Sequence, residues 1–224
     1  MKRAAIIPVL IVLLAPACAL SALIWSDNLL TNPGAETGVL APWIDGSHTI
    51  VSQSQGEHTG PVYPHSGNWF FNMAGARAGS AGQLVIETLY QDVDVRSYAP
   101  AIDRGMLLVQ ANSWLHTEDS PDHDYADYAQ LSLYFLTESG GRIGTLTTGL
   151  VQSPNDIWIA KAVDGTAPFG TRTLRLELLG RKREGGWINA FFDDAGVKVA
   201  EVPEPATLCL LSLASLQFLR RRKF

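Results

Sequence analysis

The chain alternates apolar and polar residues over short stretches, and this pattern predicts β-strands. It is clearest in residues 130–137 and 171–179, and in the second stretch leucines alternate with Arg175 and Glu177. Each stretch has one apolar and one polar face, which is typical of an antiparallel strand with one side on the core. The same reasoning predicts further strands at residues 49–53, 68–73, 83–95, 105–116, 156–163 and 189–199.

Turn residues separate several of these stretches, and helical spacing is not sustained anywhere between Leu23 and Ala200. About eight antiparallel strands in one domain, without helices or repeats, predict an all-β fold. The expected architecture is an antiparallel β-sandwich or jelly roll. Such folds carry function in loops or on one sheet face, so the fold alone names no ligand.

The first 22 residues have the three-part pattern of a secretory signal peptide. A basic start at residues 2–3 precedes an apolar stretch at 4–14, and small residues follow. We expect cleavage after Ala19 or Ala22. Lipidation at Cys18 is the alternative, but proline in the middle of the preceding segment makes a poor lipobox.

The last two dozen residues combine a proline-bracketed turn, an apolar stretch and a basic end. The turn contains Val202, Pro203, Glu204 and Pro205. The apolar stretch covers residues 206–219, and the basic end consists of Arg220, Arg221, Arg222 and Lys223. The prolines favour extended backbone and separate the tail from the preceding domain. A core helix is the alternative, because 14 apolar-rich residues fall short of the roughly 17–25 of a comfortable membrane span. Four adjacent cations favour a membrane face instead.

This order of parts resembles the PEP-CTERM sorting signal of bacterial envelope proteins, in which an exosortase reads a Pro-Glu-Pro motif, a hydrophobic segment and an Arg-rich end. The resemblance implies an exported protein of the cell envelope or extracellular space. Its expected partners are an exosortase-type sorting enzyme and the membrane, the latter through a short hydrophobic helix in the tail, residues 201–224. Deleting everything after Ala200 should leave a folded, secreted domain.

The domain between the two ends, residues 23–200, is long enough for one substantial core. The whole chain has a net charge of -5, and Arg181-Lys182-Arg183 is its one basic cluster outside the tail. We interpret this triplet as a solvated hairpin tip and expect no nucleic-acid partner. Both cysteines, Cys18 and Cys209, fall in the terminal segments, so the domain is expected to have no disulfide.

The two ends of the domain resemble galactose-binding-like and related carbohydrate-binding jelly rolls. The opening residues 32–36, Asn-Pro-Gly-Ala-Glu, with Trp43 after them, resemble the first strand of those domains. The closing residues 190–199, which contain Asp193 and Asp194, resemble the last strand. Here Ala195 and Gly196 come before the alternation resumes, which leaves the register of that strand open.

The resemblance implies a structural calcium ion that ties the first strand to the last. The matching ligands are Glu36 and Asp193 or Asp194, together with backbone carbonyls. Calcium accepts such mixed oxygen ligands in irregular geometry. The alternative is that Glu36 is a solvated turn residue and the two aspartates accept hydrogen bonds from backbone amides.

A carbohydrate binder needs exposed aromatic rings and a few polar groups. We expect Trp43, Trp69 and Trp158 in the core, whereas Trp114 and Trp187 lie beside a polar loop and a Gly-Gly turn. The predicted ligand-binding residues are therefore Trp114, Trp187, Tyr134 and Asn112.

The loop at residues 116–127 is the most polar stretch of the domain and offers Asp119, Asp122, His123 and Asp124 to a cation or a sugar. It lacks the glycine and terminal glutamate of an EF-hand. A solvated loop is the simpler interpretation.

Catalysis is the competing class of function. The sequence has no Gly-x-Ser-x-Gly elbow, His-Glu-x-x-His motif, phosphate loop or dinucleotide fingerprint, and no cysteine in the domain for thiol catalysis. A paired-carboxylate glycosidase stays open, because the fold decides which carboxylates meet. We therefore expect a non-catalytic, envelope-sorted module that binds carbohydrate or an extracellular matrix polysaccharide. The alternatives are a structural matrix protein without a small ligand and, less favoured, a glycan-active hydrolase.

Overall fold

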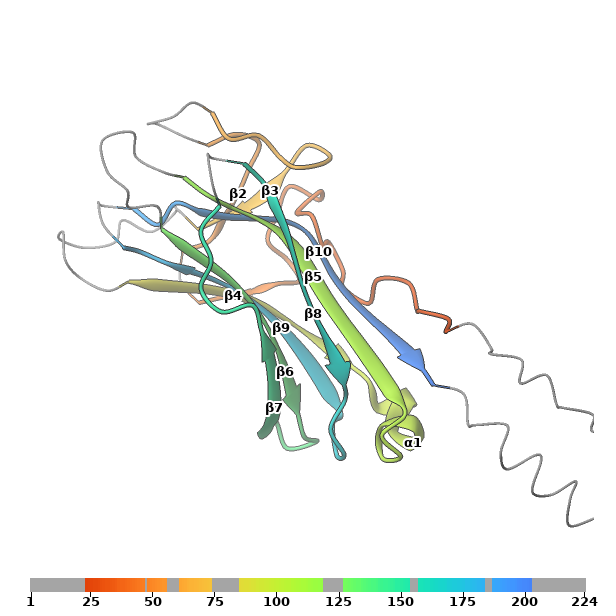
Figure 1. Cartoon of the computed structure of the whole chain (residues 1–224). Coiled ribbons are helices and arrows are strands. Elements are labelled where there is room, and N and C mark those ends of the chain that lie inside the picture. Colours follow the sequence, from red (N-terminus) through yellow and green to blue (C-terminus); the bar gives the residue numbers. More distant parts are fainter. Residues whose placement is uncertain are drawn as a thin grey trace, which may run out of the picture. The chain divides into compact units, whose positions relative to one another are not determined.

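Two antiparallel sheets pack face to face (Figure 1). The computed structural model describes residues 23–46, 48–55, 61–73, 85–118, 127–153, 157–183 and 187–202. Sheet A has the strand order β1 (Ile44–Asp45), β4 (Ile86–Asp94), β9 (Thr173–Arg181), β6 (Tyr128–Leu136) and β7 (Arg142–Thr147). Sheet B has the order β2 (Ile50–Ser52), β3 (Phe70–Asn72), β10 (Ala190–Glu201), β5 (Leu107–Thr117) and β8 (Ile159–Thr166).

The strand order is that of a jelly roll. Without the short strands β1 and β2, the first of the remaining strands, β3, pairs with the last, β10. Of the strands that lie between these two in the sequence, β4 pairs with β9, β5 with β8, and β6 with β7. This nested antiparallel pairing is the jelly-roll arrangement and confirms the predicted fold class.

The core lies between the sheets and is built by the alternation that predicts the strands. Leu174, Leu176 and Leu178 of β9 are fully buried, and the residues between them point outward. Leucines of β6 and valines and phenylalanine of β10 complete this core. A fully buried leucine stabilises the fold by about 1.5–3 kcal/mol relative to an exposed one. The three leucines therefore fix which face of β9 meets solvent.

The strand predictions are confirmed in position, with three additions. The predicted elements lack β1, β7 and a short helical turn. This turn contains a 3-10 segment (Arg96–Tyr98) and α1 (Ala99–Ile102). The interpretation of residues 181–183 as a solvated tip is wrong, because Arg181 ends β9 and Lys182 is buried. The Lys182 backbone N–H donates to the Val85 carbonyl, which draws this residue into the fold.

The register of the last strand shifts where the sequence leaves it open. β10 pairs with β5 on both sides of a bulge between Asp193 and Gly196, and Asp194 has a positive φ of 47°. The inserted residues are absorbed by this bulge, so the apolar face of β10 stays on the core on both sides of it. The segment before the first turn runs along the same strand, with the Leu29 N–H donating to the Val197 carbonyl.

Several predictions concern residues outside the described ranges. These are the signal peptide at 1–22, both cysteines, the loop residues Asp119, Asp122, His123 and Asp124, and the tail from Pro203 onward. Residues Leu23–Val202 form one compact unit. In the part of the chain that the structure describes, no helix has the length and apolarity needed to cross a membrane.

Candidate functional site

Polar and aromatic side chains cover the outer face of sheet A, which we call the sheet A face. Strands β4, β9, β6 and β7 bring residues that are far apart in the chain into rows across this face. One row contains Asp92, Arg175, Tyr134 and Thr145. The neighbouring row contains Tyr90, Glu177, Ser132 and Thr147. Each is an outward position of its strand, so the buried leucines between them hold the rows in place.

Direct contacts join the two rows. Arg175 donates to both carboxylate oxygens of Asp92, at 2.7 and 2.8 Å. Its guanidinium carbon lies 3.9 Å from the centre of the Tyr90 ring, a cation–π contact. The Tyr134 hydroxyl donates to Glu177 at 2.8 Å. These opposite and diagonal cross-strand contacts hold the side chains in one arrangement before any ligand arrives.

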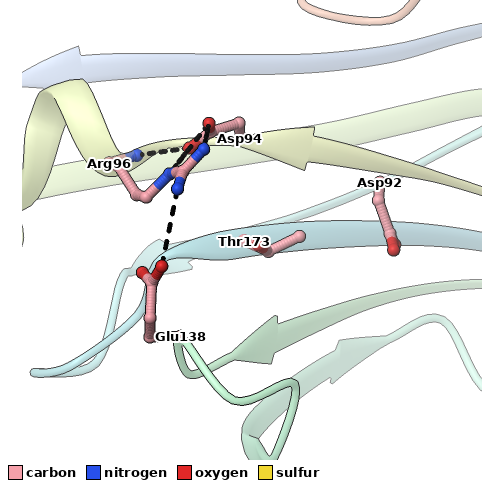
Figure 2. Close-up of a pocket in the computed structure, with 5 residues that line it drawn as sticks. All are labelled: Asp92, Asp94, Arg96, Glu138 and Thr173. Atoms are coloured by element: carbon pink, nitrogen blue, oxygen red, sulfur yellow. Dashed lines mark hydrogen bonds and ion pairs between the residues drawn. The ribbon is translucent and has the colours of Figure 1, made fainter.

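A polar hollow opens at one end of the sheet A face, where β4 ends and β9 begins (Figure 2). It has a volume of about 320 Å³ and is lined by Asp92, Asp94, Arg96, Glu138 and Thr173. The Arg96 Nε lies 3.0 and 2.9 Å from the two Asp94 carboxylate oxygens, and its Nη1 reaches Glu138 at 3.4 Å. Figure 2 shows the Arg96 guanidinium between these carboxylates.

The charges around the hollow are held in their ionised forms. Hydrogen bonds from the Arg96 side chain and backbone lower the pKa of Asp94 to about 2. The hydrogen bonds that Arg175 donates to Asp92 raise the pKa of Arg175, which therefore stays cationic. Burial, followed by the hydrogen bond to Glu177, raises the pKa of Tyr134, so its hydroxyl stays a neutral donor. The site thus presents fixed donors and acceptors at neutral pH.

This arrangement suits a hydroxyl-rich ligand. Carboxylates and guanidinium groups form charge-assisted hydrogen bonds with hydroxyl groups, and aromatic side chains pack against C–H groups. The sheet A face has both kinds of group next to each other, and the hollow gives them a concave setting.

Two of the predicted ligand-binding residues lie on the other sheet. Trp114 and Asn112 are outward positions of β5 in sheet B and are partly exposed. The His65 ring stacks on Trp114 with centroids 3.7 Å apart, so one face of the indole is covered. The Asn112 amide donates to the Asp194 carbonyl at 3.3 Å, a contact inside the bulge of β10. Both side chains therefore already have partners within the protein.

The four predicted ligand-binding residues do not form one site. Tyr134 belongs to the sheet A face, Trp114 and Asn112 belong to sheet B, and Trp187 precedes β10 with 46% of its surface exposed. Trp43 is buried, as predicted for a core residue.

The residues predicted to bind calcium reach one segment, residues 65–69, from two sides. On the first side the exposed Glu36 carboxylate accepts hydrogen bonds from the backbone N–H groups of Asn68, at 3.1 and 3.0 Å, and of Trp69, at 3.1 Å. Gly67, between those partners, has a φ of 65° and faces the same carboxylate. Glu36 therefore holds a tight turn.

On the second side Asp193 and Asp194 hold residues 65 and 66. The Ser66 N–H donates to Asp193 at 3.1 Å, and its hydroxyl donates to Asp194 at 2.7 Å. His65 Nδ1 lies 2.7 Å from the other Asp194 oxygen. Burial raises the pKa of Asp193 to about 7, and the neighbouring charge of Asp194 adds to this effect.

Two of the three predicted calcium ligands, Asp193 and Asp194, face one small space, whereas Glu36 binds backbone amides. The Oδ1 atoms of Asp193 and Asp194 lie 3.0 and 3.5 Å from the position that a Gly34 Cβ would take, so both face the space left by that glycine. In the ranges that the structure describes, no three His, Cys, Asp or Glu side chains are grouped to hold a metal ion. Any calcium site here needs backbone carbonyls to complete its ligands.

The sequence reasoning missed most of the sheet A face. The missed residues are Tyr90, Asp92, Asp94, Arg96, Glu138, Thr173, Arg175 and Glu177. The alternation on β4 and β9 marks six of these as outward positions, which is the signal that was available. The alternation does not show which strands are neighbours within the sheet, and so it does not show which of these residues meet.

Comparison with known families identifies the tail. The PEP-CTERM protein-sorting motif matches residues 201–223. A motif of this kind implies export to the cell envelope. A comparison with the curated proteins finds no match.

Solved structures of similar fold include enzymes and carbohydrate-binding modules. A cyclase from Fischerella sp. TAU gives a TM-score of 0.52 at 10% identity, over 80% of this chain and 100% of that chain. TmCBM61, solved with β-1,4-galactotriose, gives 0.48 at 18% identity, over 77% and 98%. The CBM22-1 xylan-binding domain of Paenibacillus barcinonensis Xyn10C gives 0.47 at 10% identity, over 79% and 97%. The likeness to the cyclase, at 10% identity, shows a shared fold alone.

Proposed function

We propose that this protein is a non-catalytic, envelope-sorted module that binds a polysaccharide on the sheet A face. The observation that carries the proposal is the row Asp92–Arg175–Tyr134, which connects the polar hollow to the Arg175–Tyr90 stack. A glycan lying there has hydroxyl partners in Asp92, Glu177 and Tyr134. The exposed parts of the Tyr90 and Tyr134 side chains pack against its C–H groups.

Binding without turnover fits the charges in the hollow. A glycosidase needs one carboxyl group whose raised pKa keeps a proton at working pH. Arg96 has the opposite effect on Asp94, whose pKa is lowered to about 2. Asp94 is therefore an anion that accepts hydrogen bonds and is not suited to be a general acid.

A glycan array with the full-length protein tests the proposal. We expect retention on at least one neutral or acidic polysaccharide, with no release of reducing ends. Arg175→Gln should weaken that binding about tenfold or more, because a charged hydrogen-bonding group contributes roughly 1.5–3 kcal/mol. Gln110→Ala is the matched control, because Gln110 is an outward residue of β5 in sheet B.

Three outcomes would contradict the proposal. Release of reducing ends from a bound glycan would make the protein a hydrolase. If the Arg175→Gln variant bound the glycan as tightly as the wild type and had the same unfolding midpoint, the binding site would lie outside the sheet A face. The absence of binding to any glycan, with or without calcium, would favour a structural matrix protein.

The tail is proposed to place this module in the envelope. The matched sorting motif supports recognition by an exosortase-type enzyme, and the apolar residues 206–219 ahead of Arg220–Lys223 support transient or stable membrane anchoring. Cell fractionation of a variant with Arg220, Arg221 and Arg222 changed to Gln tests this. We expect the variant to leave the membrane fraction or to remain unprocessed, and wild-type distribution would contradict the proposal.

We also propose that calcium binds at Asp193 and Asp194 and stabilises the joint between the opening turn and β10. Two adjacent carboxylates, one with a pKa raised to about 7, would be kept ionised together by a bound cation. Because only the native arrangement brings these ligands together, calcium at a hundred times its dissociation constant adds about 2.7 kcal/mol of stability.

Thermal unfolding of the full-length protein with calcium and with chelator tests the calcium site. We expect a higher midpoint with calcium in the wild type and no difference in an Asp193→Asn, Asp194→Asn double variant. A wild-type midpoint that chelation does not move would remove the calcium site and leave the glycan proposal untouched.

A further inference from the structure

Two arginines flank Tyr128 at the end of the sheet A face opposite the hollow. The guanidinium carbons of Arg181 and Arg183 each lie 5.9 Å from the centre of the Tyr128 ring. Arg181 is the direct cross-strand partner of Tyr128, so β9 and β6 fix their relation. Tyr128 and Arg181 are half-buried, and Arg183 is exposed.

A buried carboxylate holds the chain at this point. Asp127, immediately before Tyr128, accepts the Arg183 N–H at 2.7 Å through one oxygen and the Asn189 N–H at 2.7 Å through the other. Asp127 is 4% exposed, so these bonds are shielded from water. The backbone that carries Arg183 is thereby tied to the start of β6, which reduces the ordering cost of binding a ligand there.

The two ends of the sheet A face differ in charge. The hollow is lined by Asp92, Asp94 and Glu138 with one arginine, whereas two arginines meet at Tyr128. Within the described ranges, Arg181 forms no ion pair with a carboxylate. Arg181 lies eight positions after Thr173 on β9, which is about 27 Å along an extended strand. A chain of several sugar rings spans that length.

We propose that Tyr128, Arg181 and Arg183 form a subsite for the carboxylate of a uronic acid residue, which makes the ligand an acidic polysaccharide. The inference rests on the proposed glycan-binding function and names its ligand class. A guanidinium group pairs with a carboxylate through two parallel N–H···O bonds, and Tyr128 packs against the C–H face of the same sugar ring. A neutral sugar would pack against the ring and offer hydroxyl groups to the arginines, but it lacks the negative charge that makes a guanidinium–carboxylate pair stronger.

The test compares each acidic oligosaccharide with its own methyl ester, which removes the charge and keeps the sugar backbone. Full-length protein is titrated with oligomers of galacturonate, mannuronate and glucuronate and with the esterified forms. We expect at least one acid to bind fivefold or more tightly than its ester. Arg181→Gln combined with Arg183→Gln should abolish that preference while the ester affinity stays unchanged.

Two further variants make the result specific. Arg181→Lys keeps the charge but loses the planar fork, so it should lose most of the preference at moderate salt. Lys198→Gln removes one positive charge from β10 in sheet B and should keep the preference.

Each remaining outcome has a defined meaning. Equal affinity for acids and esters, or a preference that survives the double Arg→Gln change, overturns the uronate subsite but leaves glycan binding standing. Stronger binding of sulfated dextran than of any uronate, lost in the same variant, also overturns it and indicates a sulfate site. Absence of binding to every glycan, neutral ones included, removes the proposed function itself.

Discussion

His65 joins two strands of sheet B: its Nδ1 lies 2.7 Å from an Asp194 oxygen in β10, and its ring stacks on Trp114 of β5 at 3.7 Å. Ser66 bonds to both aspartates, and the next turn bonds to Glu36. The segment 65–69 therefore connects the opening turn of the domain with its last strand. The fold has no disulfide within the described residues to make this connection covalently.

Gly67 should be the most sensitive glycine of this connection. Its φ of 65° disfavours any side chain, and a Cβ there would collide with the Glu36 carboxylate. Gly140 is the matched control, because it has a φ of 81° with no atom within 4 Å of an added Cβ. We expect Gly140→Ala to cost about 1 kcal/mol and Gly67→Ala about 1–3 kcal/mol more. Chemical unfolding measures both losses of stability. Equal losses would show that the Glu36 side chain moves away from the added Cβ without a cost in stability.

Asp193 should make the protein less stable as the pH rises. Burial raises its pKa from 3.8 to about 7, so between these values the native state holds a proton that the unfolded chain has lost. The native state then binds more protons, and stability falls with pH by up to about 1.4 kcal/mol per unit. In buffer with a chelator, the free energy of unfolding of the Asp193→Asn variant should no longer fall with pH between about pH 4 and 7. An unchanged slope would contradict the burial of an ionisable carboxyl group.

Asp103 provides the opposite control. The side-chain hydrogen bond from Arg172 lowers the pKa of Asp103, so this carboxylate stabilises the fold above its unfolded pKa and loses that effect as the pH falls. Asp103→Asn should therefore flatten acid destabilisation. The same sign of change in both variants would show that the slopes come from elsewhere.

Tyr134 should matter for binding and little for folding. Tyr134→Phe removes the hydroxyl that donates to Glu177 but keeps the ring beside Arg142. We expect the free energy of unfolding to change by about 1 kcal/mol or less and the glycan affinity to fall several-fold. Glu177→Gln should have a similar effect, and the double variant should lose less than the sum because the two residues act together.

Tyr63→Phe is the matched control for Tyr134→Phe. Tyr63 is 62% exposed, and its carbonyl accepts the Trp158 indole N–H on the side of sheet B. Affinity lost equally in both variants would show that Tyr134 acts through the stability of the domain.

The fold was predictable because most strands bury one face. The apolar period of two on β6 and β9 gives both their positions and their inward residues. β7 was missed because one of its inward positions is Gly144, where a Cβ would crowd Phe135, so the strand shows no clear alternation. β1 has two residues, too few for any period.

The site was less predictable because strand neighbours are set by topology. Arg175 and Asp92 are 83 residues apart, and only the pairing of β4 with β9 makes them opposite. The carboxylates of the opening turn and of β10 could be brought together in sequence reasoning because the resemblance to carbohydrate-binding jelly rolls implies that the first and last strands of the domain share a calcium ion. The bulge at Asp193–Gly196 then directs them to residues 65 and 66.

Removing the sorting tail should leave the domain folded, provided that the cut falls after Val202. β10 continues through Glu201, which pairs with Leu107, and the Val202 N–H donates to the Met106 carbonyl at 2.8 Å. A chain that ends at Val202 keeps these bonds, whereas one that ends at Ala200 loses both. Each backbone bond contributes about 0.5–1.5 kcal/mol, so the shorter chain should be about 1–3 kcal/mol less stable yet still folded. Thermal unfolding of the two secreted proteins measures the difference. Aggregation of the chain that ends at Val202 would show that residues beyond it belong to the core.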